Sequence, residues 1–331
     1  MNDFRAWMLR ETEGGPPSLE LERLGFDELP EGEVLVEVHW STVNYKDALA
    51  VAGKGKIARR FPMVPGIDLA GVVRESASRE FAIGDEVLLT GWGIGETHWG
   101  GYAELARVKA DWLLPVPPNL GMRGVMAVGT AGFTAAQAVR ALQKAGVAPG
   151  GDRPVIVTGA CGGMGSIAVV LLAGEGYRVT ALTGRPENAD YLHHLGATDI
   201  LPREELQGPG RPLESERWAG GIDAVGGEIL ARILAQTATW GAVAACGLAG
   251  DSNLSTTVMP FILRGVSLLG IHSVRAPSEV RREAWDLLSR NLPPDLLEEM
   301  TEEASMEQLP QVAERVLAGR VRGRTVLSIR G

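Results

Sequence analysis

Residues 154–174 read PVIVTGACGGMGSIAVVLLAG, and this stretch decides the fold. Its first part, residues 154–158, is a short apolar run bounded by proline and glycine, which favours a buried strand over a helix. The last part, residues 166–174, is continuously apolar and typical of a buried helix. A strand, a glycine-rich turn and a helix in this order predict the first unit of a doubly wound parallel sheet.

Working outward from this unit, strand and helix patterns alternate. Residues 131–145 are rich in Ala, Leu and Gln, a composition that predicts a helix. Pro149 and the two glycines after it end this helix. Uniformly apolar strands spaced by helices predict a parallel sheet that is covered on both faces. The further strands are expected at residues 177–183, 221–225, 242–246 and 266–271.

The first third of the chain has a different texture. Residues 33–40 alternate apolar and polar side chains at period two, as a half-buried strand does, and short strands are expected at 71–74 and 86–90. The tail, a helix at 311–319 and a strand at 324–329, resembles this first third more than the middle. We therefore expect an α/β protein in which a Rossmann domain, residues 127–274, is inserted into a mainly β domain formed by residues 1–126 and 275–331.

Composition excludes several classes of protein. The 331 residues hold 43 glycines without a collagen period and only two cysteines, which excludes a disulfide framework and a cysteine-rich zinc module. A net charge of −9 gives no electrostatic reason to bind nucleic acid or an anionic membrane. The N-terminus lacks the apolar core of a signal peptide, and no run approaches the roughly 20 apolar residues of a membrane span. We expect a soluble cytoplasmic protein.

The glycine-rich turn predicts a dinucleotide site. Its spacing is G-x-x-G-G-x-G, from Gly159 to Gly165, instead of the strict G-x-G-x-x-G. Missing side chains let the backbone approach a pyrophosphate, and the amides at the next helix N-terminus supply donors. The alternative is that the glycines serve only close packing of the strand and the helix.

The end of the next strand distinguishes the two nicotinamide cofactors. A site for NAD usually places an acid here to bind the ribose 2′-hydroxyl. This chain has Thr183-Gly184-Arg185 and no acid, and a guanidinium can bind a 2′-phosphate in a bidentate way. The sequence therefore predicts NADPH, with a solvated role for Arg185 as the alternative.

Two polar segments in the first third are candidate ligand sites. Asn44-Tyr45-Lys46-Asp47 follows a strand and is either a solvated turn or part of a site. Residues 53–61 carry four positive charges and no negative one in a protein of opposite net charge. Such a cluster indicates an anionic ligand such as the phosphates of a coenzyme A ester, unless it is a solvated face. The four cations are Lys54, Lys56, Arg59 and Arg60.

A metal site is not expected. Zinc needs three or four ligands, usually Cys and His at ordered spacing. Cys161 lies in the glycine-rich turn and Cys246 at the end of a later strand, and none of the five histidines is spaced to join them.

Longer stretches carry a resemblance to a known family. Residues 33–331 resemble, almost continuously, the zinc-free quinone-oxidoreductase branch of the medium-chain dehydrogenases/reductases, and within it the acryloyl-CoA reductase (NADPH) subgroup. Zinc-dependent relatives carry a ligand histidine where this chain has Ile67, and the glycine turn departs from the subgroup at Cys161 and Met164. The matching stretches are 44–50, 53–57, 61–71, 88–93, 98–101, 129–135, 218–220, 244–250, 256–264 and 323–325.

The resemblance implies a GroES-like catalytic domain beside the Rossmann domain, and hydride transfer from NADPH to the β-carbon of acryloyl-CoA, which gives propanoyl-CoA. Tyr45 is then the first candidate to line the nicotinamide and to donate a proton, with simple packing as the alternative. Lys46 and Asp47 would orient Tyr45 or bind the ribose, and Asn44 joins the four cations as a candidate substrate-binding residue.

The resemblance also implies cofactor-binding residues and a homodimer. The implied dimer forms through the strand at 266–271. Besides Tyr45, the candidate cofactor-binding residues are Gly159, Cys161, Gly162, Gly163, Met164 and Gly165 at the pyrophosphate, Thr183, Gly184 and Arg185 at the adenosine phosphate, and Ala224, Leu268 and Arg324 nearby.

Two other functions stay open. One is a broader NADPH:quinone or enone reductase on the same fold, which would not need the four cations for affinity. The other is an NADPH-binding protein without turnover.

Overall fold

The computed structural model describes residues 3–330, which form two compact units. The first unit contains the chain up to Thr130 and again from Leu297 onward, and the second is Ala131–Leu296. Part of the segment predicted for the first domain makes its contacts in the second unit, since Trp285 stacks on Phe133 with ring centroids 6.4 Å apart. The compact units divide after Thr130 and after Leu296, whereas the predicted domain boundaries lie after residues 126 and 274. The predicted boundaries stay a prediction.

The second unit is built on a six-stranded parallel sheet, with strand order β10-β9-β8-β11-β12-β13. The order reverses at β8, so β8 and β11 flank the switch point at which doubly wound sheets bind ligands. The predicted doubly wound fold is confirmed. The strands are β8 (Val155–Thr158), β9 (Val179–Thr183), β10 (Asp199–Pro202), β11 (Trp218–Asp223), β12 (Thr237–Ala245) and β13 (Ser267–Gly270).

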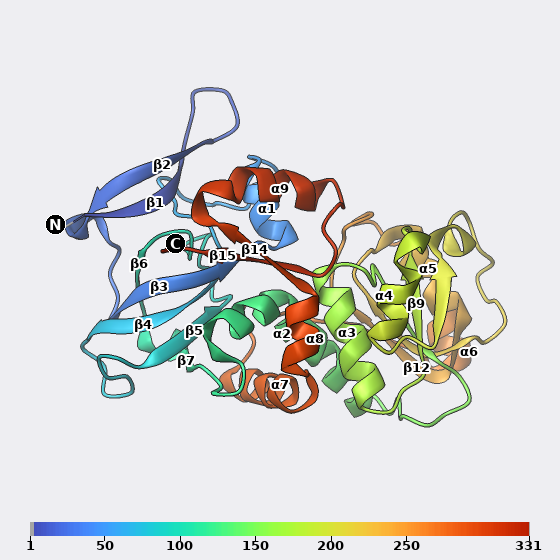
Figure 1. Ribbon diagram of the computed structural model, residues 1–331. Helices are drawn as coiled ribbons and strands as arrows, with labels where there is room; N and C mark the ends of the chain where they lie inside the picture. Colours follow the sequence, from blue (N-terminus) through green and yellow to red (C-terminus); the bar gives the residue numbers. More distant parts are fainter. Residues whose placement is uncertain (1–2, 331) are drawn as a thin grey trace. The chain divides into compact units, whose positions relative to one another are not determined.

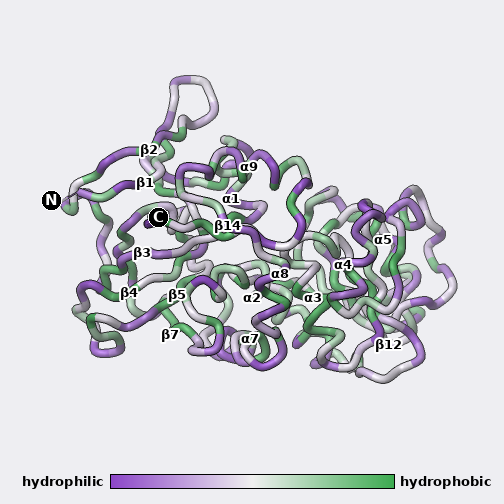
Figure 2. Tube along the Cα trace, viewed as in Figure 1, coloured by the Kyte–Doolittle hydropathy of each residue, from purple (hydrophilic) through white to green (hydrophobic). Residues whose placement is uncertain are grey.

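Helices complete this unit. In α3 (Gly163–Gly174) every residue from Gly165 to Leu172 is buried, and the helix is hydrophobic along most of its length (Figure 2). Burial of such a face, at roughly 25 cal/mol per Å² of apolar surface, is the main force that holds helix to sheet. The other helices are α4 (Ala189–His194), α5 (Gly227–Gln236), α6 (Met259–Arg264) and α7 (Ser278–Asn291).

The first unit is mainly β, as predicted. A seven-stranded sheet has the order β14-β15-β3-β4-β5-β7, with β6 also paired to β3, and β1 and β2 form a separate antiparallel pair. The C-terminal β15 pairs antiparallel with β3, which confirms that the tail belongs with the first third. The strands are β1 (Asp3–Arg10), β2 (Ser18–Gly25), β3 (Val34–Thr42), β4 (Asp68–Ser76), β5 (Glu86–Thr90), β6 (Leu105–Val108), β7 (Leu114–Pro115), β14 (Thr301–Ser305) and β15 (Arg324–Ser328).

Two helices of the first unit, α1 (Tyr45–Val51) and α9 (Leu309–Leu317), lie side by side (Figure 1). The short α8 (Pro294–Glu299) spans the later division between the units. Helix α1 was not predicted, because the polar segment at its start has the composition of a turn.

The long helix α2 (Gly121–Lys144) is interrupted at Gly129, where φ is 50° and ψ is −162°. Within residues 3–330 it is the one helix long and apolar enough to cross a membrane, but 78% of its most apolar window is buried. It is therefore a core helix of the fold.

Candidate active site

The glycine-rich turn joins β8 to α3 as predicted. Gly159 has a φ of 58°, and the Gly162 N–H donates a hydrogen bond of 2.9 Å to its carbonyl. A Cβ on Gly165 would lie 2.3 Å from the Gly159 carbonyl oxygen, so this glycine is required by packing of the helix on the turn. A Cβ on Gly162 would meet only that oxygen, at 3.2 Å. The turn thus requires Gly165 for packing, while a Cβ at Gly162 would make one tight contact with the Gly159 carbonyl oxygen.

This arrangement fits a dinucleotide pyrophosphate. The first N–H groups of α3, at Gly163, Met164 and Gly165, have no acceptor within their own helix, as at every helix N-terminus. The Cys161 side chain is buried and its Sγ lies 3.2 Å from Thr183 Oγ1. Cys161 therefore faces β9, and its contribution to the predicted site would come from its backbone.

Ala224 lies at the same end of the sheet, beside Gly159. The Thr158 hydroxyl donates to the buried Asp223 carboxylate at 2.7 Å and accepts from the Ala224 N–H at 2.9 Å. A Cβ on Gly159 would be 3.7 Å from Ala224 Cβ. Burial raises the pKa of Asp223, and the Gly226 N–H also donates to this carboxylate at 2.7 Å. This buried cluster fixes the ends of β8 and β11 at the switch point.

Arg203 is a residue that the sequence reading missed. The Arg185 N–H donates to Thr183 Oγ1 at 2.9 Å, which orders the end of β9. A Cβ on the exposed Gly184 would lie 3.1 Å from Arg203 Cζ. Arg203 directly follows β10, the neighbour of β9, and adjacent parallel strands end at one edge of the sheet. Strand β10 was not among the predicted strands, so no predicted element pointed to Arg203.

Leu268 lies on β13, the last strand of the sheet, and is 36% exposed. Other large apolar side chains near it in the sequence are exposed as well: Leu248, Val258, Met259, Ile262 and Leu263. The structure thus places Leu268 on an exposed strand with exposed apolar neighbours in the chain.

In the first unit, the predicted quartet forms the start of α1. The Asp47 carboxylate accepts hydrogen bonds of 2.9 Å from the Asn44 N–H, Asn44 Nδ2 and the Ile67 N–H. Burial raises the pKa of Asp47 to about 7, with the nearby charge of Asp68 adding to the effect. Asp47 is thus enclosed by the chain, and it positions Asn44 and Ile67.

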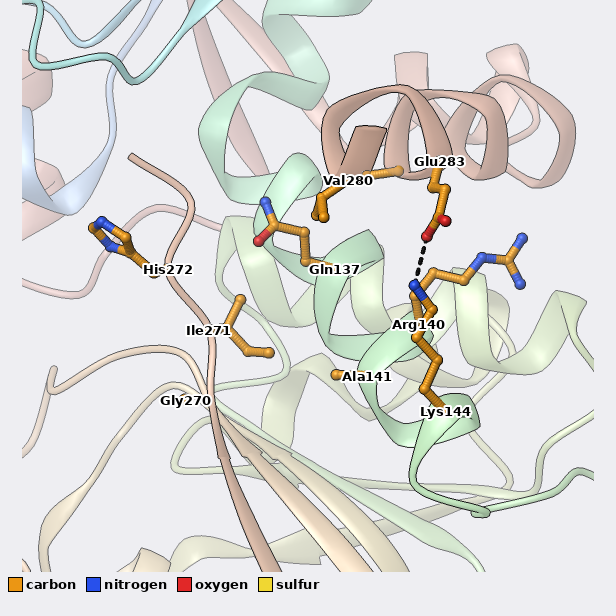
Figure 3. A pocket seen from close by; sticks show the side chains of 10 residues that line it. Gln137, Arg140, Ala141, Lys144, Gly270, Ile271, His272, Val280 and Glu283 are labelled. Atoms are coloured by element: carbon orange, nitrogen blue, oxygen red, sulfur yellow. Dashed lines mark hydrogen bonds and ion pairs between the residues drawn. The ribbon is translucent and has the colours of Figure 1, made fainter. Parts of the chain in front are cut away.

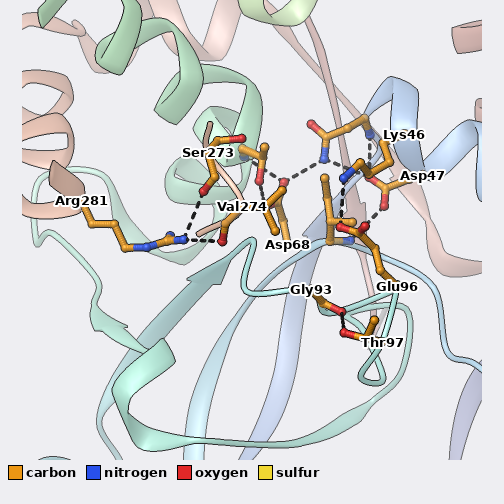
Figure 4. A network of polar contacts seen from close by, with 12 residues as sticks. Lys46, Asp47, Asp68, Gly93, Glu96, Thr97, Ser273, Val274 and Arg281 are labelled. Atoms are coloured by element: carbon orange, nitrogen blue, oxygen red, sulfur yellow. Dashed lines mark hydrogen bonds and ion pairs between the residues drawn. The ribbon is translucent and has the colours of Figure 1, made fainter. Parts of the chain in front are cut away.

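Arg324 belongs to the same buried network. Its guanidinium donates to the Ala127 carbonyl and to Thr42 Oγ1, both at 2.8 Å. The Asp68 carboxylate accepts from Asn44 Nδ2 at 2.8 Å and from the Thr130 N–H at 2.9 Å (Figure 4). Burial raises the pKa of Asp68 and lowers that of Arg324, while the opposite charges of the two counteract both effects.

Tyr45 and Lys46 are the members of the quartet that reach the surface. Tyr45 is 42% exposed at the first position of α1. Lys46 Nζ lies 2.9 Å from Glu96 Oε1 (Figure 4). These two side chains, unlike Asp47, are available to a ligand.

The predicted basic cluster lies on the loop between α1 and β4. Its four cations are exposed, and none of them forms an ion pair with a carboxylate within residues 3–330. The Arg59 N–H donates to the Glu96 carbonyl at 2.8 Å. The cations are Lys54, Lys56, Arg59 and Arg60.

A cavity of about 170 Å³ in the second unit is lined by α2, α7 and residues 270–272 (Figure 3). Lys144 and Glu283 form an ion pair of 2.7 Å there. None of the predicted site residues lines this cavity. In the described part of the chain, no three His, Cys, Asp or Glu side chains gather as they would around a metal ion.

The fold and the two ligand-facing regions define a class, the two-domain nicotinamide-dependent oxidoreductases with a GroES-like domain. Residues 30–118 match the alcohol dehydrogenase GroES-like domain, and residues 163–290 match the zinc-binding dehydrogenase domain. The chain belongs to the medium-chain dehydrogenase/reductase family, in its zinc-free acryloyl-CoA reductase subgroup.

Individual relatives cover nearly the whole chain. It is 52% identical to the probable acrylyl-CoA reductase AcuI of Escherichia coli, over 97% of this chain and 99% of the relative. It is 51% identical to the acrylyl-CoA reductase AcuI of Ruegeria pomeroyi, over 97% of both chains. The crystal structure of Escherichia coli YhdH with bound NADPH has a TM-score of 0.95 and 51% identity, over 98% of this chain and 100% of that one.

Proposed function

We propose that this protein is a zinc-independent reductase that uses NADPH to convert acryloyl-CoA, a short 2-enoyl-CoA, to propanoyl-CoA. The observation that carries the proposal is the similarity at 51–52% identity, over nearly full length, to relatives named acrylyl-CoA reductase. It agrees with the glycine turn at the switch point and with the unpaired cations on the first unit.

NADPH supplies the hydride when it is bound. The N-terminal amides of α3 would hold its pyrophosphate. Arg185 and Arg203 at the end of β9 and β10 would bind the 2′-phosphate, which NADH lacks. Arg324 stays a candidate residue near the cofactor, and two of its guanidinium donors are used inside the first unit, on the Ala127 carbonyl and Thr42 Oγ1.

The remaining chemistry belongs to the chain's own side chains. Negative charge develops on the thioester oxygen during reduction, and preorganised donors stabilise such charge. Tyr45 is exposed, whereas Lys46 is half-buried and paired with Glu96, and we assign the proton for the α-carbon to Tyr45. In Tyr45→Phe, kcat should fall by about 10²-fold, as for the loss of a general acid, with a smaller change in the KM for NADPH. Unchanged turnover would remove Tyr45 as the proton donor.

The four cations Lys54, Lys56, Arg59 and Arg60 are proposed to bind the phosphates of coenzyme A. They are exposed and have no carboxylate partners within residues 3–330, so a phosphate would not have to displace one. Exposed charge pairs weaken as salt screens them. The KM for acryloyl-CoA should therefore rise with ionic strength, and it should do so less after Lys54 and Lys56 are both changed to Gln.

The function is tested by NADPH oxidation with acryloyl-CoA, crotonyl-CoA and a simple quinone in parallel. We expect the highest kcat/KM with acryloyl-CoA. Preference for the quinone would support the broader quinone or enone reductase, and no oxidation with any acceptor would support a binding protein without turnover.

We infer further that the protein works as a homodimer in the cytoplasm. Strand β13 ends the sheet of the second unit, and Ile262 and Leu263 are 71% and 60% exposed. A sheet edge with apolar neighbours favours pairing with a second copy. Two free cysteines fit a reducing compartment. In sedimentation, Ile262→Asp should halve the mass of the wild-type particle; a monomeric wild type would contradict the dimer.

A further inference from the structure

Glu96 joins two parts of the first unit that the proposed function uses. Its carboxylate lies 2.9 Å from the Lys46 ammonium, and its side chain is only 12% exposed (Figure 4). Its backbone carbonyl accepts a hydrogen bond of 2.8 Å from the Arg59 N–H. One residue thus contacts the candidate catalytic segment with its side chain and the basic loop, residues 54–60, with its backbone.

The turn that carries Glu96 is closely packed. The N–H groups of Glu96, Thr97 and His98 all donate to the Gly93 carbonyl, at 3.2, 2.9 and 3.2 Å. Gly95 has a φ of 73°, and a Cβ on it would lie 3.0 Å from the Gly66 nitrogen. The direction of the Glu96 carbonyl is therefore fixed by the turn and by the contact of Gly95 with Gly66, while Lys46 holds the carboxylate.

We propose that Glu96 is a positioning residue that couples binding of the CoA phosphates to the placement of the Lys46 ammonium. The inference rests on the proposed function. Phosphates bound to the cations of the basic loop hold that loop, and the Arg59–Glu96 hydrogen bond transmits the restraint to the Glu96 carboxylate. Binding energy from a remote part of the substrate is then used at the reacting centre.

If the coupling exists, turnover should differ between two substrates that share the reacting acryloyl thioester. The acryloyl thioester of N-acetylcysteamine has the same double bond and thioester as acryloyl-CoA, but neither phosphates nor adenosine. With coupling, the truncated thioester should lose turnover as well as affinity, because binding that is used for positioning appears in kcat.

The experiment compares kcat and KM for both thioesters in the wild type and in Glu96→Gln, which keeps the size and an acceptor oxygen but removes the charge. We expect a wild-type kcat at least about tenfold higher with acryloyl-CoA than with the truncated thioester. Glu96→Gln should remove most of this difference by lowering the kcat for acryloyl-CoA alone. The matched control is Glu283→Gln, which removes the partner of Lys144 in the second unit and should change neither kcat.

The possible results distinguish failure of the coupling from failure of the proposed function. Equal loss of kcat on both thioesters in Glu96→Gln would overturn the coupling and leave the proposed function intact. A wild type that reduces neither thioester would overturn the proposed function. If Glu96→Gln does not fold, the wild type alone is decisive, because equal kcat values for the two thioesters would also overturn the coupling.

Discussion

The two candidate ligand regions are built in opposite ways. In the second unit the turn from Gly159 to Gly165 offers backbone amides, and its packing depends on a position without a side chain, Gly165. In the first unit a buried network of charged side chains, centred on Asp68 and Arg324, fixes the shape while Tyr45 and Lys46 reach the surface. The backbone site is therefore sensitive to added atoms, whereas the side-chain network is sensitive to removed ones.

The largest effect is expected for removal of a charge from the buried network. Asp68→Ala leaves the Arg324 guanidinium without its buried counter-charge and the Thr130 N–H without an acceptor. The free energy of unfolding should fall by roughly 3–5 kcal/mol, as measured by urea denaturation. Adding Arg324→Met should recover part of this loss. No recovery would show that the network stabilises through its hydrogen bonds alone.

The second effect is the pH dependence of stability that Asp47 contributes in the first unit. Burial raises the pKa of Asp47 to about 7, so the folded state binds this proton more tightly than the unfolded chain does. The associated stability is complete below about pH 4 and is lost as the pH rises to about 7. Between pH 5 and 8 the wild type should lose roughly 2–3 kcal/mol that Asp47→Asn does not lose. The free energy of unfolding is measured by urea denaturation at each pH. If it changes with pH equally in the two proteins, the assignment to Asp47 is contradicted.

Addition of one methyl group should disable the backbone site. In Gly165→Ala the new Cβ would lie 2.3 Å from the Gly159 carbonyl oxygen, so the turn must move. We expect a stability loss of roughly 1–3 kcal/mol and a large rise in the dissociation constant for NADPH, measured by fluorescence titration. Gly174→Ala, on the same helix with its nearest contact at 3.7 Å, is the control and should lower neither the stability nor the affinity for NADPH.

The smallest effect should be selective for the cofactor. Arg203→Ala removes a guanidinium beside Gly184 and should raise the KM for NADPH by about 10-fold, the value of one charge-assisted hydrogen bond. The KM for NADH should stay within twofold. Equal changes for both cofactors in steady-state kinetics would place Arg203 outside the 2′-phosphate site.

The same contrast explains what the sequence could predict. The glycine turn and its flanking strand and helix are contiguous, so their order alone indicates the Rossmann unit and its switch point. The buried network joins residues far apart in the chain, such as Arg324 and Thr42, which only the fold brings together. Helix α1 escaped prediction although Asn44 and Asp47 form a capping box, a spacing that marks a helix start.

Arg203 could not be predicted for a different reason, which lies in the pairing of two neighbouring strands. Its neighbour Gly184 is 19 positions away in the chain, and the contact follows from the pairing of β9 with β10. The strand order was predictable for this fold, but the position of the turn after β10 was not, because no glycine motif marks it.

Hydride transfer from NADPH to acryloyl-CoA can be followed with a deuterium label. The protein is incubated with acryloyl-CoA and NADPH deuterated at C4 on the transferred face, and the product is examined by mass spectrometry and NMR. We expect propanoyl-CoA that carries one deuterium on C3 of the acyl group. Consumption of NADPH without labelled propanoyl-CoA would contradict it.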